Sequence, residues 1–354
     1  MEFEFGLPVQ KLNEIQHSDF IWTWKSNKRS SRMSLWLPYY GKAEKIPRSK
    51  HWKISYNGGI LEVDLSSIDF IMLYGATGDL PVAFLDELSQ HRITLIIHRR
   101  NQPFPYVFQP VPSSDDADVL TKQILFRENQ IKRVYIAKTL IKARLSQMAG
   151  MLAISPTVLS ELAKSKKIED VRAIEAHQTA RYWKQYFTGL KLDVSRREQS
   201  PIASALDAGS KFLYGIMLRW ILFHKMSPCH AYLHEPSSYP TLAYDLMEPY
   251  RYIFEEAVAA AAASGIGDSK KLVAKSLSIL KDNLEVIVYV PATRQYVRRK
   301  NLLHGAVLAL RAYLLGEVPR LVLPQEGKRK GGRPPKTGYR LPGETKPGKE
   351  NGGI

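Results

Sequence analysis

The pattern of apolar and polar positions changes about a third of the way along the chain. Before residue 110, short apolar runs bounded by turn residues predict strands at 60–65, 69–75 and 93–100. Between the last two runs, residues 80–91 have apolar side chains at helical spacing. We therefore expect a mainly β domain over residues 1–110 that contains a strand–helix–strand unit, with residues 1–33 as a possible extension.

The remainder of the chain has a different pattern. Residues 111–118 are rich in proline, serine and aspartate, which is typical of a linker. Most later segments are long and have apolar residues at helical spacing, which predicts a larger all-α domain over residues 119–323 and an α+β fold class. Residues 324–354 are rich in glycine, proline and lysine, so we expect a disordered basic tail.

The charge balance favours a polyanionic partner. Fifty-one lysines and arginines stand against thirty-four acids, which gives a formal net charge of +17. Nucleic acid is the commonest polyanion in a cell, although a basic protein without such a partner is the alternative. Only six of the basic residues lie between Lys328 and Arg340, so most of the positive charge belongs to the folded part.

Cysteine content and hydropathy restrict the class of protein further. Cys229 is the single cysteine, which excludes an internal disulfide framework and a multi-cysteine zinc site. The N-terminus does not have the pattern of a signal peptide, and no apolar stretch is long enough for a membrane span. We expect a soluble cytoplasmic protein with no membrane partner.

One polar constellation lies in the segment YLHEPSSYPTLAYDLMEPY, residues 232–250. His234 is on a proline- and serine-containing loop, and a short helix is expected after Pro240. Asp245 and Glu248 are three residues apart and therefore project from one face of that helix. A histidine and two carboxylates suit Mn²⁺ or Mg²⁺, whereas the alternative is that all three are ordinary surface residues.

A second constellation lies in the helical segment IEAHQTARYWKQYF, residues 174–187. Glu175 lies beside an apolar stripe and precedes the aromatic pair Tyr182-Trp183. A glutamate in that position is usually a boundary residue of a helix. The chain has neither a G-x-S-x-G motif nor a Walker loop, which disfavours a serine hydrolase of that type and a P-loop nucleotidase.

Together, the two segments resemble the CRISPR-associated "Cas one" family, the spacer-acquisition integrases of CRISPR adaptation. The matching features are Glu175 before the aromatic pair, the Leu233-His234 pair, and the helix Ala-Tyr-Asp-Leu-Met-Glu at 243–248. The resemblance covers roughly residues 34–316. It implies that Glu175, His234 and Asp245 are the catalytic residues and metal ligands, that Glu248 is a supporting second acid, and that the cofactor is Mn²⁺ or Mg²⁺.

The resemblance also implies an activity and partners. The activity is that of a metal-dependent DNA endonuclease and integrase of antiviral defence, which joins 3′-OH ends of prespacer DNA to a CRISPR repeat beside its leader by transesterification. The partners are double-stranded DNA and a second copy of the chain, with two homodimers bridged by a small ferredoxin-like adaptation protein. One departure is that Ala203 and Asp207 stand where the family often has asparagines.

Other functions stay open at this stage. A nuclease or transposon-type integrase of the same fold, acting outside CRISPR, is one alternative, and a non-catalytic DNA-binding assembly protein is another. Arg298, Arg299 and Lys300 are candidates for contacts with DNA phosphates, although a solvated helix face also explains them. Arg333 and Lys336 lie in a segment that resembles an AT-hook, and a solubilising tail is the alternative.

Overall fold

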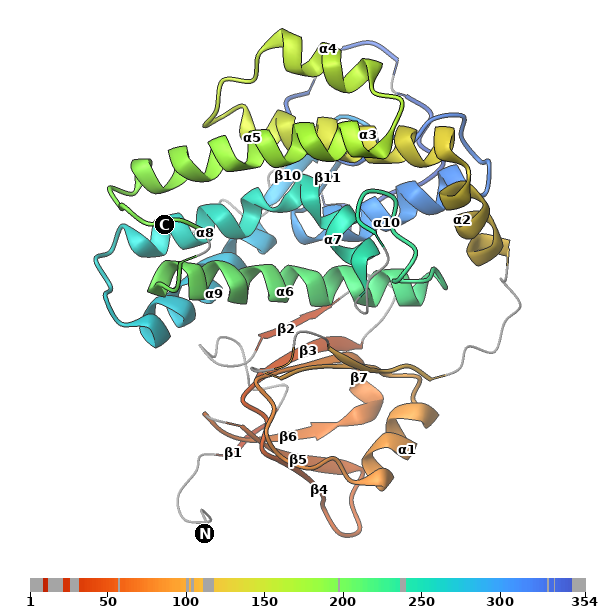
Figure 1. Cartoon of the computed structure of the whole chain (residues 1–354). Helices are drawn as coiled ribbons and strands as arrows, with labels where there is room; N and C mark the ends of the chain where they lie inside the picture. Colours follow the sequence, from red (N-terminus) through yellow and green to blue (C-terminus); the bar gives the residue numbers. More distant parts are fainter. Residues whose placement is uncertain are drawn as a thin grey trace. The chain divides into compact units, whose positions relative to one another are not determined.

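The computed structural model describes residues 9–11, 22–25, 32–56, 58–99, 102, 105–110, 118–196, 198–235, 240–329, 331–333 and 335–345. The chain divides into two compact units, Met1–Asp115 and Asp116–Ile354 (Figure 1). Residues 111–117 of the predicted linker lie outside the described residues. The N-terminal strands and the mostly helical C-terminal unit confirm the expected fold class.

The described residues of the N-terminal unit form two sheets. A four-stranded sheet has the order β1-β6-β5-β4, and a five-stranded sheet has the order β2-β3-β7-β8-β9. The bounds of the strands, of one short 3-10 helix and of one α-helix are β1 Val9–Lys11, β2 Trp22–Lys25, β3 Met33–Pro38, β4 Lys42–Lys45, β5 His51–Tyr56, β6 Gly59–Asp64, η2 Leu65–Ser67, β7 Ile68–Tyr74, α1 Val82–Gln90, β8 Thr94–His98 and β9 Tyr106–Phe108.

Side-chain alternation explains which strands lie inside. Strand β7 pairs in parallel with β3 and β8, and most of its side chains are buried, as is usual for a central parallel strand. Strands β5 and β6 alternate between buried and more exposed positions, so each contributes one face to the core. Helix α1 connects β7 to β8, which confirms the predicted strand–helix–strand unit.

The C-terminal unit is a mostly helical assembly (Figure 1). Its elements are α2 Asp118–Glu128, α3 Gln130–Met148, α4 Pro156–Lys164, α5 Ile168–Gly189, α6 Pro201–Phe223, α7 Thr241–Met247, η3 Glu248–Tyr250, α8 Tyr252–Ala262, α9 Ser269–Glu285, β10 Ile287–Val290, β11 Gln295–Arg298 and α10 Lys300–Leu314.

Helix α6 is buried on nearly all sides because it packs against α7, α8, α9 and α10. A Cβ at Gly209 would lie 2.9 Å from the Cβ of Phe254, so glycine permits the close approach of α6 and α8. Asn129 separates α2 from α3 because its side chain accepts a hydrogen bond from the backbone N–H of Lys132 and caps α3. Within the described residues, none of the helices combines the length and apolar character needed to cross a bilayer.

The expectation of an all-α domain needs one correction. Strands β10 and β11 form an antiparallel hairpin within the C-terminal unit, with Val288 opposite Val297. The inward-facing valines of this hairpin are buried, and α10 begins only at Lys300. Residues 291–294 form the turn of this hairpin, and residues 295–298 form its second strand.

The expectation of a disordered tail is wrong for the part of it that the structure describes. This segment has no helix or strand, but its Leu341 side chain is only 3% exposed. The side chain of Gln295 donates to the carbonyl of Leu341 at 3.0 Å and accepts from its N–H at 2.9 Å. A Cβ at Gly305 on α10 would clash with Leu341, so glycine makes room for the leucine. The segment is therefore anchored on α10 and the hairpin.

Candidate active site

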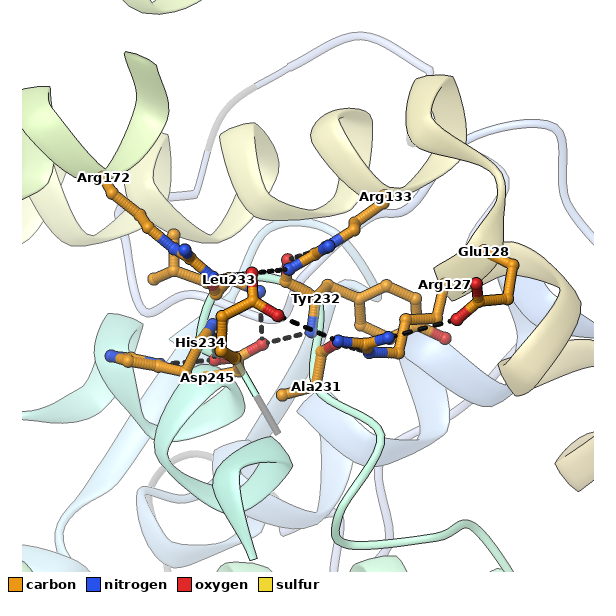
Figure 2. A network of polar contacts seen from close by, with 10 residues as sticks. Arg127, Glu128, Arg133, Arg172, Ala231, Tyr232, Leu233, His234 and Asp245 are labelled. Carbon is orange, nitrogen blue, oxygen red and sulfur yellow. Dashed lines mark hydrogen bonds and ion pairs between the residues drawn. The ribbon is translucent and has the colours of Figure 1, made fainter. Parts of the chain in front are cut away.

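Asp245 of α7 holds the loop that carries His234. One oxygen of the buried Asp245 carboxylate accepts from the backbone N–H groups of Tyr232 and Leu233, both at 2.7 Å. The other accepts from the N–H of His234 at 3.2 Å and contacts the His234 Nδ1 at 2.6 Å (Figure 2). A carboxylate offers about four lone-pair positions, and four donors use them here.

This arrangement fixes the chemistry of the His234 ring. Because the carboxylate is an acceptor, Nδ1 carries the proton in the neutral imidazole, and Nε2 keeps a lone pair. Burial lowers the pKa of His234, but the hydrogen bond to Asp245 and the charges of Asp245 and Glu248 outweigh burial and raise it overall. Figure 2 shows the second ring nitrogen pointing away from Asp245.

The carbonyl side of the same loop is held by arginines. Arg127, Arg133 and Arg172 donate through Nε to the carbonyls of residues 231, 232 and 233, at 2.9, 3.0 and 2.6 Å (Figure 2). These arginines come from α2, α3 and α5, which are separate helices of the unit. The loop has no secondary structure of its own, so side chains supply the hydrogen bonds of its backbone.

Glu175, on α5, lies in the same electrostatic neighbourhood. Its carboxylate accepts from the hydroxyl of Thr179, one turn later, at 2.8 Å. Burial raises the pKa of Glu175, and the negative charge of Glu248 raises it further, whereas Thr179, His234 and Arg251 act in the opposite direction. The charge of Glu248 thus acts on the pKa of both Glu175 and His234, although the three residues come from three different elements.

Behind these residues lies a buried cluster of arginines and glutamates. Arg144 of α3 makes a two-point contact with Glu255 of α8, at 3.0 and 2.7 Å, and Tyr182 donates to the same carboxylate at 2.8 Å. Glu248 is paired with Arg251 at 2.9 Å. Both Glu248 and Glu255 are almost fully buried, so each needs the positive charge beside it.

The donor set fits a hard divalent cation in type. Two carboxylates and one imidazole nitrogen are ligands that Mn²⁺ accepts readily. The described residues contain no group of three His, Cys, Asp or Glu side chains already arranged to hold a metal ion. In the structure, Glu248 faces Arg251, and that guanidinium supplies the positive charge beside it.

The predicted basic residues divide into two groups. Arg298 and Lys300 both pair with Glu285, at 2.7 and 2.6 Å, and Arg299 pairs with Glu326 at 3.0 Å. Two glutamates thus offset part of the positive charge of these three residues, and their role in binding phosphates stays a prediction. Arg333 and Lys336 are exposed on the anchored C-terminal segment.

The two positions that depart from the family's asparagines lie on α6. Ala203 is buried, and Asp207 is exposed and pairs with Arg196. Neither residue contributes to the group around His234 in the described contacts.

Sequence reasoning missed the arginines of the site and Glu255, the partner of Arg144. One signal was present: Arg144 occupies a position of α3 that is spaced with the buried residues Ala137, Ile141 and Met148. A charged residue in a buried helical stripe requires a buried partner. Arg127, Arg133 and Arg172 have no such local signal, because their partners are backbone carbonyls about sixty to one hundred residues away.

Comparison with known proteins finds relatives both by sequence and by structure. One relative by sequence is "CRISPR-associated endonuclease Cas1 2" of Moorella thermoacetica (strain ATCC 39073 / JCM 9320), 26% identical over 206 residues, or 54% of this chain and 64% of the relative. The chain thus matches less than two thirds of that relative's length.

The structural likenesses concern the fold. "Casposase bound to integration product" has a TM-score of 0.65 at 20% identity, over 81% of this chain and 91% of that one. "Cas6-RT-Cas1--Cas2 complex" has a TM-score of 0.64 at 14% identity, over 84% of this chain and 37% of that one.

The family comparison covers the candidate site. Residues 48–278, more than half of the chain, match the family described as CRISPR associated protein Cas1. This stretch includes Glu175, His234, Asp245 and Glu248, and the structural likenesses agree with it in fold. The chain therefore belongs to the CRISPR-associated protein Cas1 family.

Proposed function

We propose that this chain is a metal-dependent DNA endonuclease and integrase that joins 3′-OH ends of prespacer DNA to a CRISPR repeat. The observation that carries the proposal is the 2.6 Å contact between His234 Nδ1 and Asp245, beside Glu175 and Glu248. It leaves the Nε2 lone pair of His234 for a cation, next to two carboxylates whose charges repel.

We assign the metal ligands as Glu175, His234 through Nε2, and Glu248. Asp245 was the expected third ligand, but its lone pairs already accept four hydrogen bonds from the loop and the His234 ring. We therefore assign Asp245 the role of orienting His234. Glu248, expected as a supporting acid, takes the place of the third ligand by releasing Arg251.

A divalent cation in this position would polarise a phosphodiester and stabilise the charge that builds on its oxygens. The chain's own residues perform the remaining tasks. His234 is held in one tautomer, and the carboxylates of Glu175 and Glu248 supply negative charge where the cation is needed. Arg251, once Glu248 engages the cation, keeps a second carboxylate partner in Glu255, at 3.5 Å.

We propose DNA as the substrate and further protein copies as partners. The net charge of +17 favours a polyanion, and a structural neighbour is a casposase bound to an integration product. A second neighbour is a complex that includes Cas1 and Cas2, which supports a small adaptation protein as a partner of this chain. Homodimers, two of them bridged by that protein, remain our expectation for the assembly.

The test is a strand-transfer assay in Mn²⁺ with a short duplex bearing 3′-OH ends and a supercoiled plasmid that carries a CRISPR repeat. The wild-type chain is expected to join the duplex to the plasmid. Glu175→Gln and Glu248→Gln are expected to reduce joining by at least about 100-fold, since loss of residues that merely orient ligands already costs 10–100-fold. Glu317→Gln, an exposed glutamate paired with Arg311, is the matched control.

Two substrate changes separate the alternatives. A duplex with 3′-deoxy ends should abolish joining but leave nicking by water, which distinguishes transesterification from hydrolysis. A plasmid without the repeat should receive few insertions, whereas equal insertion into both plasmids would favour a transposon-type integrase. Absence of joining and cleavage above the Glu175→Gln background would refute the enzymatic proposal.

A further inference from the structure

Glu235, the residue after His234, gathers the three arginines of the loop. Nη2 of Arg133 and of Arg172 each lies 2.8 Å from one Glu235 oxygen, and Nη2 of Arg127 lies 3.3 Å from the other. The Glu235 side chain is half exposed, and the hydrogen bond from Arg133, with that from Arg172, lowers its pKa. Glu235 is therefore shared among three guanidinium groups.

Each arginine uses one edge of its guanidinium for two acceptors. Nε donates to a loop carbonyl (Figure 2), and Nη2 on the same edge donates to Glu235. Because a guanidinium is planar and rigid, the position of Nη2 determines the direction in which Nε points. Glu235 thus determines the direction in which all three Nε groups donate. Its negative charge also offsets the repulsion among the three guanidinium groups.

Three successive peptide units of the loop are each bound at both the carbonyl and the N–H group. The carbonyl of residue 231 is bound by Arg127 and the N–H of residue 232 by Asp245, and these two groups belong to one planar peptide unit. The next unit is held by Arg133 and Asp245, and the last by Arg172 and Asp245. The last unit is the one from which the His234 side chain departs.

We propose that Glu235 is a positioning residue, which uses Arg127, Arg133 and Arg172 to fix the backbone that aims His234 at Glu175 and Glu248. This inference rests on the proposed function, because it concerns the histidine that we assign as a metal ligand. Asp245 holds the N–H side of the three planes, and the arginines hold the carbonyl side. An isolated exposed ion pair would contribute little, but these pairs are coupled to the loop.

The test compares Glu235→Gln with Glu317→Gln, which removes a carboxylate from a single exposed ion pair elsewhere in the unit. The metal-free proteins, labelled with ¹⁵N-histidine, are studied by NMR, and the His234 signals are assigned by their loss in His234→Asn. The wild type is expected to show one tautomer, protonated at Nδ1. Glu235→Gln is expected to show averaged ring signals, whereas Glu317→Gln keeps the wild-type spectrum.

The same proteins are then titrated with Mn²⁺ by electron paramagnetic resonance well below their unfolding temperatures. Glu235→Gln is expected to bind Mn²⁺ about 10- to 100-fold more weakly, with a matching fall in kcat and an unchanged KM for DNA. Arg172→Lys keeps the charge but loses the planar guanidinium group. It is also expected to weaken Mn²⁺ binding and to lower kcat. A lowered unfolding temperature with wild-type Mn²⁺ affinity and ring signals would overturn the inference.

A rise in KM for DNA alone would also overturn it, since the arginines would then serve the substrate instead of the histidine. Failure of the proposed function is a separate outcome. If the wild type binds no Mn²⁺ and cleaves no DNA, the assigned metal site is wrong, but the ring signals of the metal-free proteins still decide whether Glu235 fixes His234. Wild-type ring signals in Glu235→Gln would reject the positioning role in either case.

Discussion

Replacing Asp245 by asparagine removes one of the two oxygens that hold the His234 loop. The four donors are Tyr232 N–H and Leu233 N–H on one oxygen, and His234 N–H and Nδ1 on the other. The amide has a single acceptor oxygen, so its NH₂ group must face one of these two pairs. The two orientations have different consequences.

If the NH₂ group faces Tyr232 and Leu233, two buried N–H donors lose their acceptor. Each such loss costs about 1–3 kcal/mol, so the free energy of unfolding should fall by about 2–6 kcal/mol. If the NH₂ group faces His234 instead, one N–H loses its acceptor, at about 1–3 kcal/mol, and Nδ1 must accept the amide proton. The ring proton then moves to Nε2, which can no longer bind a cation.

Asp245→Asn should therefore have one of two outcomes. In the first, the free energy of unfolding falls by the larger amount. In the second, it falls by the smaller amount and the Mn²⁺ affinity falls with it. Urea unfolding in the presence of a chelator measures the first quantity, and a Mn²⁺ titration of the folded protein measures the second. Asp207→Asn, at an exposed aspartate on α6, is the control. An Asp245→Asn protein with wild-type stability and wild-type Mn²⁺ affinity would refute the hydrogen-bonding scheme.

Four further outcomes follow from the same geometry. The pKa of Glu175 is raised, so the folded chain binds that proton more tightly than the unfolded chain and loses stability as pH rises through this pKa. Glu175→Gln should therefore raise the metal-free unfolding temperature at neutral pH, and calorimetry should show the difference vanish in acid. Glu255→Gln removes the two-point partner of Arg144, leaving Glu248 at 3.9 Å beside the buried guanidinium, and should cost about 3–5 kcal/mol in urea unfolding; an unchanged midpoint would contradict the buried pair. Free Mn²⁺ at 100 times its Kd should stabilise the wild type by about 2.7 kcal/mol, and the gain should be absent in Glu248→Gln and reversed by chelation. Leu341→Ala should cost about 2–5 kcal/mol, whereas a loss close to zero would show that the C-terminal anchor is not formed in solution.

Local periodicity was sufficient to predict the elements that depend on it. The β7–α1–β8 unit and the long helices follow from apolar spacing, because a single face of each element meets the core. The β10–β11 hairpin was missed because its four-residue strands are too short for a clear alternation and run directly into α10. The tail was missed because its average composition hides Leu341, the leucine that anchors it.

The candidate site was predictable only in part. Spacing places Asp245 and Glu248 one turn apart on the chain, but it does not reveal that the Asp245 acceptors face backbone N–H groups. That distinction between orienting residue and ligand depends on where the 232–234 loop lies in three dimensions. Arg144 and Glu255 come from α3 and α8, so their contact requires the packed unit.

The anchoring of Leu341 affects how the charge of the C-terminal segment can be studied. A truncation before this segment removes six basic residues between 328 and 340, but it also uncovers Gly305 on α10 and breaks both hydrogen bonds to Gln295. Weaker DNA binding by such a shortened protein would therefore combine an electrostatic loss with a repacking of α10. Changing Arg333 and Lys336 to glutamine keeps the leucine in place, so the salt dependence of binding then reports on charge alone.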